Sequence, residues 1–307
     1  MIKPRALKLG DRIAVVAPAS SFARDEFDRG IRELSRLGFE PVFDDRVFAT
    51  ESGYLAGSAD TRAATFMTYW DDPRVAALMA VRGGFGSVHI LPLLDGARIK
   101  ANPKLFIAYS DNTSLLSWLT CACGITALHG PMLEGRLAEG TAKYDERSFL
   151  ALARDGRGLS LCPNGLVALR EGDAAGPLFG GTITNLAASL GTPYAFDPPD
   201  GCVLFLEDVN ERPFRIDRML TQLRLSGVLG RARALVFGEM RGCDEPGGAV
   251  TVRQVIERFT ADTPGPALFG FPSGHTTGPC WTLPLGVSVR VTTRPQPMLV
   301  VEESPVN

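Results

Sequence analysis

The chain is poor in the residues that bind metal ions or nucleic acids. Only 3 of its 307 residues are histidine, and its 6 cysteines are scattered without a CxxC pair or an HExxH pattern. Zinc sites need several such ligands at close spacing, so we expect no metal and no cofactor. The formal net charge is -2, whereas a dedicated nucleic-acid binder carries clustered excess lysine and arginine. We therefore expect no nucleic-acid partner.

Long apolar runs are also missing. No stretch is long enough to span a bilayer, and residues 1–11 carry charge without the apolar core of a signal peptide. We therefore expect a cytoplasmic protein without a membrane partner, in which the cysteines are reduced and mainly structural. With 45% apolar and 21% charged residues, the composition is ordinary for a soluble globular enzyme.

Strands and helices alternate in the first half of the chain. Apolar runs predict strands at 12–18, 41–43, 75–81 and 105–109, and helical spacing predicts helices at 25–37, 60–70 and 86–94. This alternation predicts a parallel sheet covered on both faces, with reactive groups at the carboxyl ends of its strands.

The length allows about two domains. The polar, glycine-rich stretch 136–176, with one expected helix near 145–154, is the expected linker between an N-terminal domain, 1–135, and a C-terminal domain, 177–307. The C-terminal part mixes short strands with helices.

Ser110 stands where the strand 105–109 runs into an amphipathic helix. Such a turn lifts the hydroxyl out of the sheet, and the unpaired amides that open the helix face the space in front of it, which suits an oxyanion. Ser110 would then be a nucleophile. The alternative is that Ser110 or Asp111 only caps the helix, since both residue types are preferred there.

Two later segments offer partners for a serine nucleophile. The strand 202–206 ends in Glu207, and the glycine-containing loop 269–278 carries His275. A histidine can take the serine proton, and a carboxylate can fix the histidine tautomer and support the imidazolium. Ser110, Glu207 and His275 are therefore the candidate catalytic residues. His129, after the strand 125–128, either shapes the site or only packs.

A glycine-rich turn, Arg82-Gly-Gly-Phe-Gly86, follows the strand 75–81. It does not match GxGxxG, and no Gly-Lys-Ser/Thr follows, so it does not predict a nucleotide site. It suits close approach of the backbone to a substrate, and the amides of Gly84 and Asp111 are the candidate oxyanion hole. Gly83 and Arg82 are candidate substrate-binding residues; Arg82, or Arg62 upstream, would pair with an anionic substrate end. An ordinary tight turn is the alternative.

Several motifs in this order resemble the LD-carboxypeptidase family of serine peptidases, which includes muropeptide LD-carboxypeptidases and microcin C self-immunity peptidases. They are Tyr54-Leu-Ala-Gly-Ser58 with Arg62, Arg82-Gly-Gly-Phe-Gly86, Ala108-Tyr-Ser-Asp111, His129-Gly-Pro-Met132, Gly180-Gly-Thr-Ile-Thr-Asn-Leu186, Leu206-Glu-Asp208 with Phe214-Arg-Ile-Asp-Arg218, and Gly270-Phe-Pro-Ser-Gly-His275. Together they cover nearly the whole chain. Ala108 departs from the family's usual glycine at that position.

The resemblance implies an α/β protein with an N-terminal Rossmann-like parallel-sheet domain and a smaller C-terminal domain built on a β-sandwich or barrel-like core. Ser110 would come from the first domain, and Glu207 and His275 from the second. It further implies a peptidase that cleaves the L,D-amide bond before the terminal D-Ala of muropeptide tetrapeptides in cell-wall recycling. We also expect a homodimer.

Three other functions remain open at this point. A microcin C immunity-type peptidase would cleave aminoacyl-nucleotide amides instead. An α/β-hydrolase esterase has the same chain order of serine, acid and histidine, although the sequence around Ser110 lacks the second glycine of GxSxG. A non-catalytic protein could hold a ligand between its two lobes.

Overall fold

The first half of the chain builds the predicted parallel sheet. The computed structural model describes all 307 residues, and its first sheet has the strand order β12-β5-β4-β3-β1-β2. The strands are β1 (Arg12–Val16), β2 (Glu40–Val42), β3 (Val75–Ala80), β4 (Leu105–Ala108), β5 (Ala127–His129) and β12 (Leu283–Leu285). Only β12 runs antiparallel. Every residue of β3 and β4 is buried, as expected for strands covered on both faces.

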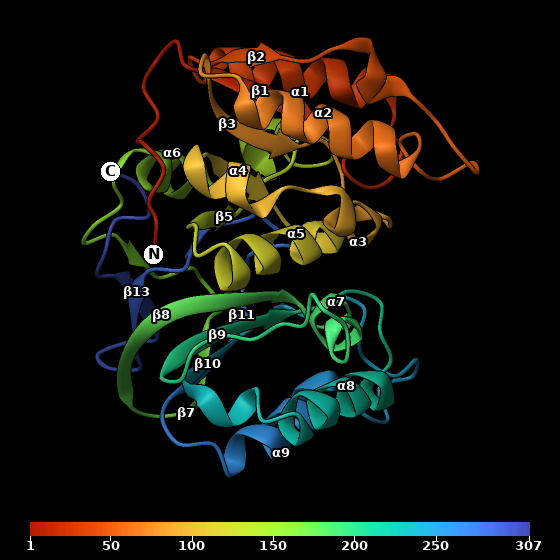
Figure 1. The fold of residues 1–307 in the computed structure, drawn as a ribbon. Helices are drawn as coiled ribbons and strands as arrows, with labels where there is room; N and C mark the ends of the chain where they lie inside the picture. Colours follow the sequence, from red (N-terminus) through yellow and green to blue (C-terminus); the bar gives the residue numbers. More distant parts are fainter.

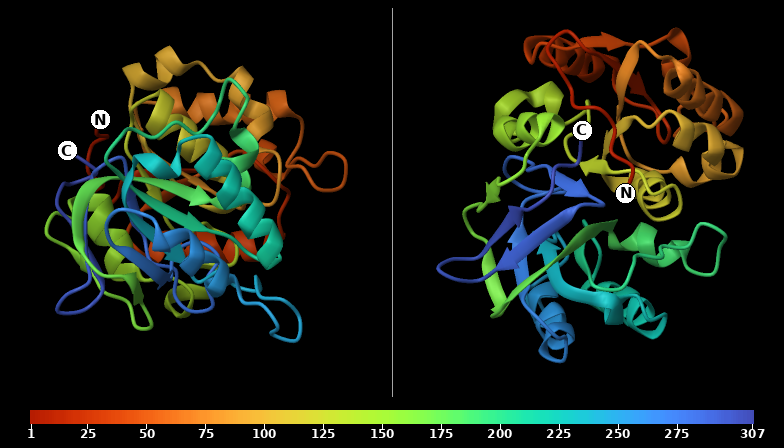
Figure 2. Two further views of the ribbon diagram at one scale, coloured as in Figure 1. Left: turned by 90° about the horizontal axis from the view of Figure 1, so that it is seen from below. Right: turned by 60° about the vertical axis from the view of Figure 1, so that its left-hand side comes forward.

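Helices cover both faces of this sheet (Figures 1 and 2). They are α1 (Arg24–Arg36), α2 (Ala59–Asp71), α3 (Ser87–Ile90), α4 (Gly96–Ala101), α5 (Thr113–Ser117) and α6 (Glu146–Arg154). In α1, Phe27 and Leu34 are buried while the charged residues face outward, which is the pattern of an amphipathic helix packed on a sheet. The Rossmann-like arrangement predicted for the N-terminal half is confirmed.

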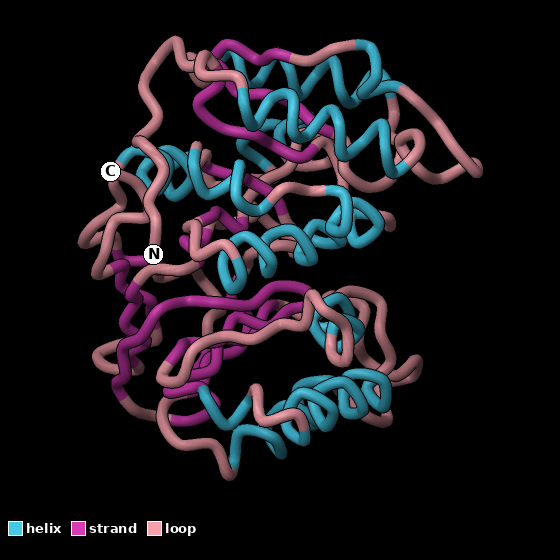
Figure 3. Tube along the Cα trace, viewed as in Figure 1, coloured by secondary structure: helices cyan, strands magenta, loops and turns pink.

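The second sheet is curled and has the strand order β6-β14-β13-β8-β9-β10-β11-β7 (Figure 3). Its strands are β6 (Ser160–Leu161), β7 (Val167–Arg170), β8 (Asp173–Thr182), β9 (Cys202–Glu207), β10 (Ala232–Gly238), β11 (Ala267–Phe271), β13 (Ser288–Thr292) and β14 (Met298–Val301). The central strands β8 to β11 are parallel. The C-terminal core is therefore the barrel-like form of the two expected.

The two faces of this sheet bury different cores. Because side chains alternate along a strand, Leu204 and Leu206 of β9 pack with helices α7 (Ile183–Ser189), α8 (Pro213–Leu225) and α9 (Val252–Ala261). Val203 and Phe205 instead join the large core that continues into the first sheet. The same alternation puts Glu207, two residues after Phe205, on the face that looks toward the N-terminal half.

The chain crosses between the two halves more than once. The segment 136–176, expected as a linker, contains α6 and the short strands β6 and β7 of the second sheet. Near the C-terminus, β12 returns to the first sheet and pairs with β5, Leu283 opposite His129. The loop between β11 and β12, residues 272–282, therefore runs from the second sheet to the first, and His275 lies in it.

Candidate active site

Ser110 occupies a strained turn directly after β4. Its φ angle is 64°, in the left-handed region that non-glycine residues seldom adopt and that marks exposed nucleophiles at strand-to-helix turns. Its hydroxyl lies 2.9 Å from Nε2 of His275. Neither the η3 turn that Ser110 opens (Ser110–Asn112) nor α5 has a side-chain cap. The hydroxyl thus contacts the histidine and does not act as a helix cap.

Glu207 approaches the other side of the imidazole. Nδ1 of His275 lies 2.9 Å from Oε2 of Glu207, and the same oxygen accepts the His275 backbone amide at 3.1 Å. Gly274 is essential to this approach: its φ is +78°, and a Cβ there would lie 2.8 Å from Cδ of Glu207. The glycine noted in the loop sequence thus lets the backbone pass against the carboxylate.

The Glu207 carboxylate is 1% exposed, so each of its oxygens needs a partner. Besides the contacts to His275, Oε1 accepts a hydrogen bond of 2.5 Å from the Thr182 hydroxyl at the end of β8. Thr182 lies in the string Gly180-Gly-Thr that carried the family resemblance, but its type and position gave it no role in the sequence analysis. Only the pairing of β8 with β9 brings Thr182 opposite Glu207.

The charges of this pair are set by burial and by mutual attraction. Burial would raise the pKa of Glu207, but the adjacent His275 and the hydrogen bonds outweigh it and lower that pKa to about 2. For His275, burial lowers the pKa, while the Glu207 carboxylate raises it by more, so the net pKa lies above the ordinary value. Glu207 is therefore ionised near neutral pH and stabilises a protonated imidazole.

The glycine turn lies directly against Ser110. A Cβ on Gly83 would be 2.7 Å from both Cβ and Oγ of Ser110 and 3.2 Å from the Asp111 amide nitrogen. The Gly84 amide donates no hydrogen bond within the protein, and the Asp111 amide follows Ser110 at the start of the turn. The structure therefore brings both candidate oxyanion donors into the neighbourhood of the nucleophile.

The two candidate arginines have different surroundings. Arg82 is 45% exposed, and its Nε lies 3.1 Å from the Glu134 carboxylate. Arg62 is 3% exposed and donates to the carbonyls of Pro18, Gly57 and Gly86. Arg62 therefore holds backbone carbonyls together, and Arg82 is the more accessible of the two candidates for an anionic substrate end.

His129 lies behind the triad and is fully buried. Its Nδ1 is 2.8 Å from the Ser273 hydroxyl. Burial lowers the pKa of His129 to about 4, so this imidazole is neutral near pH 7. Its ring packs against those of Tyr109 and Phe205, with centroids 6.1 Å and 5.1 Å away.

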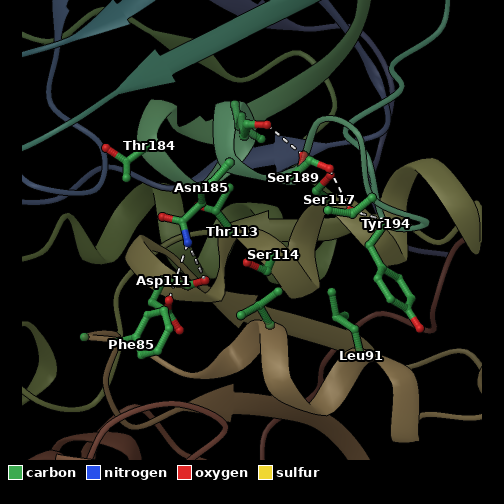
Figure 4. Close-up of a pocket in the computed structure, with 15 residues that line it drawn as sticks. Phe85, Leu91, Asp111, Thr113, Ser114, Ser117, Thr184, Asn185, Ser189 and Tyr194 are labelled. Carbon is green, nitrogen blue, oxygen red and sulfur yellow. Dashed lines mark hydrogen bonds between the residues drawn. The ribbon is translucent and has the colours of Figure 1, made fainter. Parts of the chain in front are cut away.

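A cavity of about 230 Å³ opens beside the candidate oxyanion donors (Figure 4). Its walls come from both halves of the chain, with Phe85 and Asp111 at one end and Tyr194 and Leu91 at the other. The Asn185 amide bridges the halves by donating to the backbone oxygen of Asp111 at 3.3 Å. The cavity therefore opens beside the turn that carries Ser110, although none of the three candidate catalytic residues lines it.

Two further properties bear on the predictions. No group of three or more histidine, cysteine or acidic side chains is arranged to hold a metal ion. None of the helices combines the length and apolarity needed to cross a bilayer.

The chain matches two family models and many individual proteins. Residues 13–130 match the LD-carboxypeptidase N-terminal domain and residues 175–291 the LD-carboxypeptidase C-terminal domain. The "Probable murein peptide carboxypeptidase" of Bacillus subtilis is 33% identical over 95% of this chain and 92% of its own. The murein tetrapeptide carboxypeptidase of Pseudomonas aeruginosa is 32% identical over 86% and 88%.

A solved structure gives the same result for the fold. The microcin C7 self-immunity protein MccF, in complex with aspartyl sulfamoyl adenosine, superposes with a TM-score of 0.91 at 25% identity and covers 100% of both chains. Together with the two domain models and the relatives above 30% identity, this establishes that the chain belongs to the LD-carboxypeptidase family.

Proposed function

We propose that this protein is a serine LD-carboxypeptidase that cleaves the amide bond before the terminal D-Ala of murein tetrapeptides. The observation that supports this most strongly is the hydrogen-bonded row of Ser110, His275 and Glu207, with contacts of 2.9 Å on each side of the imidazole. Relatives named murein peptide and murein tetrapeptide carboxypeptidase support the substrate class.

In the proposed reaction, His275 takes the Ser110 proton through Nε2 while the serine oxygen attacks the amide carbonyl. Glu207 keeps the proton of His275 on Nδ1 and stabilises the imidazolium that forms. The carbonyl oxygen becomes an oxyanion, for which the amides of Gly84 and Asp111 are the proposed donors. Because these amides are held by the turn before the reaction begins, they need little reorganisation.

The imidazolium then gives its proton to the nitrogen of the leaving D-Ala, and the carbon–nitrogen bond breaks. The peptide remains as an ester on Ser110. A water molecule, deprotonated by His275, attacks this ester. The shortened peptide leaves, and the Ser110 hydroxyl is regenerated. The row of three residues thus serves both halves of the reaction.

Substrate binding is proposed at the turn and the neighbouring cavity. Gly83 leaves room for the scissile bond beside Ser110, since any side chain there would contact Oγ. Arg82, half exposed beside Glu134, is the proposed partner of the terminal carboxylate. The cavity lining contains no lysine or arginine, so it suits an uncharged part of the substrate better than the carboxylate.

Cleavage of aminoacyl-nucleotide amides is the second candidate. It is supported by the similarity to MccF, whose structure was solved with aspartyl sulfamoyl adenosine. The relatives above 30% identity that carry a carboxypeptidase name favour the murein substrate. Comparison of kcat/KM for a murein tetrapeptide and an aminoacyl sulfamoyl adenosine decides between the two.

The cellular setting is part of the same proposal. All six cysteines are free thiols, which suits the reducing cytoplasm, where murein fragments are recycled. We also propose that the protein is a homodimer. Light scattering on the purified chain measures its mass in solution, and fractionation of cells followed by detection of the protein measures its location.

The central experiment uses three peptides that differ only at the last residue. A murein tetrapeptide ending in D-Ala should be cut, whereas the L-Ala epimer and the C-terminal amide should be poor substrates. Released alanine is identified by mass and chirality. Similar kcat/KM values for all three would show that neither stereochemistry nor the terminal charge is recognised, and would favour a general amidase or esterase.

Two serine variants test the nucleophile. Ser110→Ala should fold normally and lose at least about three orders of magnitude in rate, as removal of a triad nucleophile does. Ser114 lines the cavity beside the turn, whereas the serine bonded to His275 is Ser110. Ser114→Ala should therefore lose far less of the rate. If Ser110→Ala keeps most of the activity, Ser110 is not the nucleophile. That result would favour a binding protein whose preparation contains a contaminating hydrolase.

A further inference from the structure

Arg136 is a buried arginine that no motif singled out. It lies just before the η5 helix (Leu137–Ala142), in the segment expected to be a linker, and is 8% exposed. No carboxylate lies within ion-pairing distance of its guanidinium; its partners are backbone carbonyls and one phenol. A buried charge without an ion-pair partner is costly, so its contacts should have a specific use.

These contacts converge on the loop that carries His275. Nη2 of Arg136 donates to the carbonyl of Gly274 at 2.8 Å and to that of Thr276 at 3.0 Å. These are the residues on either side of His275. Nη1 reaches the carbonyl of Gly278 at 3.3 Å. The guanidinium thus satisfies the buried carbonyls on both sides of the histidine.

The opposite edge of the loop is held by carboxylates. Glu207 accepts the His275 amide at 3.1 Å, and Glu239 accepts the Thr277 amide at 2.8 Å and a hydrogen bond from the Thr276 hydroxyl. The amides of His275 and Thr277 therefore donate to acids, whereas the carbonyls of Gly274 and Thr276 accept from Arg136. This opposed anchoring fixes the peptide planes on either side of His275, and with them the direction of its side chain.

Arg136 also contacts the aromatic wall of the imidazole. Its Nε lies 3.4 Å from the Tyr109 hydroxyl, and the Tyr109 ring meets the His275 ring edge to face, with centroids 5.3 Å apart. Tyr109 is the residue before Ser110. Arg136 therefore joins the loop of the base to the turn of the nucleophile.

We propose that Arg136 is a positioning residue for His275, whose guanidinium clamps the two carbonyls flanking the histidine and so holds the imidazole in line between Ser110 and Glu207. The proposal rests on the function proposed above for the triad. An error of about 1 Å in the position of a reacting group can cost roughly a hundredfold in rate, so loss of the clamp should lower kcat more than KM.

The guanidinium has an electrostatic consequence as well. Burial and the Arg136 cation both lower the pKa of His275, against the stronger opposite effect of Glu207. The titratable and charged groups around His275 and its loop are Tyr109, His129, Arg136, Glu207, Asp208, Glu239 and Cys280. Removing the cation should raise the pKa of His275 further, which moves the acid limb of the pH–rate profile to higher pH.

Two substitutions separate geometry from charge. Arg136→Met keeps the aliphatic stem but removes charge and donors; we expect kcat to fall about a hundredfold or more, KM to stay within about threefold, and the acid limb to move upward. Arg136→Lys keeps the charge but cannot span both carbonyls as a planar fork does. It should lose kcat about tenfold, with the acid limb near that of the unsubstituted protein.

Arg62→Lys is the matched control. Arg62 is also buried and also donates to three backbone carbonyls, none of which belongs to the His275 loop. Its substitution should lower the melting temperature without moving the acid limb. If Arg136→Met only lowers the melting temperature, while its pH profile and kcat per folded molecule match the unsubstituted protein, Arg136 is merely structural and the inference is wrong.

A serine-directed fluorophosphonate separates this inference from the proposed function. The reagent labels an activated serine without needing a peptide, and mass spectrometry counts labelled, folded molecules. The clamp is supported if Ser110 is labelled about a hundred times faster in the unsubstituted protein than in Arg136→Met. Equal labelling rates in the two proteins overturn it. If Arg136→Met does not fold, Arg136→Lys replaces it in the comparison, and an unchanged labelling rate in that variant overturns the clamp. Absence of labelling in the unsubstituted protein would instead refute the proposed nucleophile.

Discussion

Replacement of Glu207 by glutamine tests the electrostatics of the site most directly. The carboxylate is buried and lies 2.9 Å from Nδ1 of His275. Coulomb's law gives roughly 6 kcal/mol for two unit charges at that distance and an effective dielectric constant of about 20. Each charge is spread over two atoms and the amide keeps a dipole, so we expect the substitution to remove about half of this, roughly 3 kcal/mol.

The direction of the change follows from the opposing effects on His275. Burial lowers its pKa, and Glu207 raises it by more. In Glu207→Gln the effect of burial, which is the largest single effect, remains, and Asp208 raises the pKa by less, so the pKa should fall below the ordinary histidine value. The acid limb of any residual activity should move to lower pH, although kcat itself should drop by roughly ten thousandfold because the glutamine favours the wrong tautomer.

The pKa can be measured without turnover. Only 3 histidines contribute ring signals to a proton NMR titration, and His129, whose pKa is held at about 4 by burial, separates from the others. Glu239→Gln is the control, since Glu239 anchors the same loop without contacting the imidazole. If the pKa of His275 is unchanged or higher in Glu207→Gln, the assigned charge pair of His275 and Glu207 is refuted.

Three further results are expected. Gly83→Ala should lower kcat about a hundredfold, because its methyl group would sit 2.7 Å from Oγ of Ser110; an unchanged rate would mean that the turn can move away. Activity should survive prolonged chelation, and loss with recovery on added zinc would contradict a metal-free mechanism. In the unsubstituted protein, kcat/KM should fall as the pH drops through the His275 pKa, which lies above the ordinary value because of Glu207; an acid limb below that of free imidazole would contradict this.

The sequence by itself determined the local features of the site. A buried run ending at Ser110, a strand ending at Glu207 and glycines around His275 are patterns of neighbouring residues, and each depends only on strand periodicity and turn chemistry. The alternation of strands and helices likewise predicted the first sheet. The motif order indicated the family, which the two domain models confirm.

Other elements show no such local pattern. The strand β8 has the sequence DAAGPLFGGT, and its glycines and proline do not predict a strand. It forms because it pairs with β9 on one side and β13 on the other. The segment 136–176 reads as a polar linker, although its strands complete the second sheet.

Only the tertiary structure decided which residues support the triad. Thr182 meets Glu207 through the register of two parallel strands, and Arg136 meets the His275 loop across more than a hundred positions of sequence. Local sequence does not distinguish Arg62 from Arg82. In the folded chain, Arg62 donates to buried backbone carbonyls, whereas Arg82 is half exposed. The physical reason is that hydrogen-bond partners of buried polar groups are chosen by proximity in the folded chain, which local sequence does not encode.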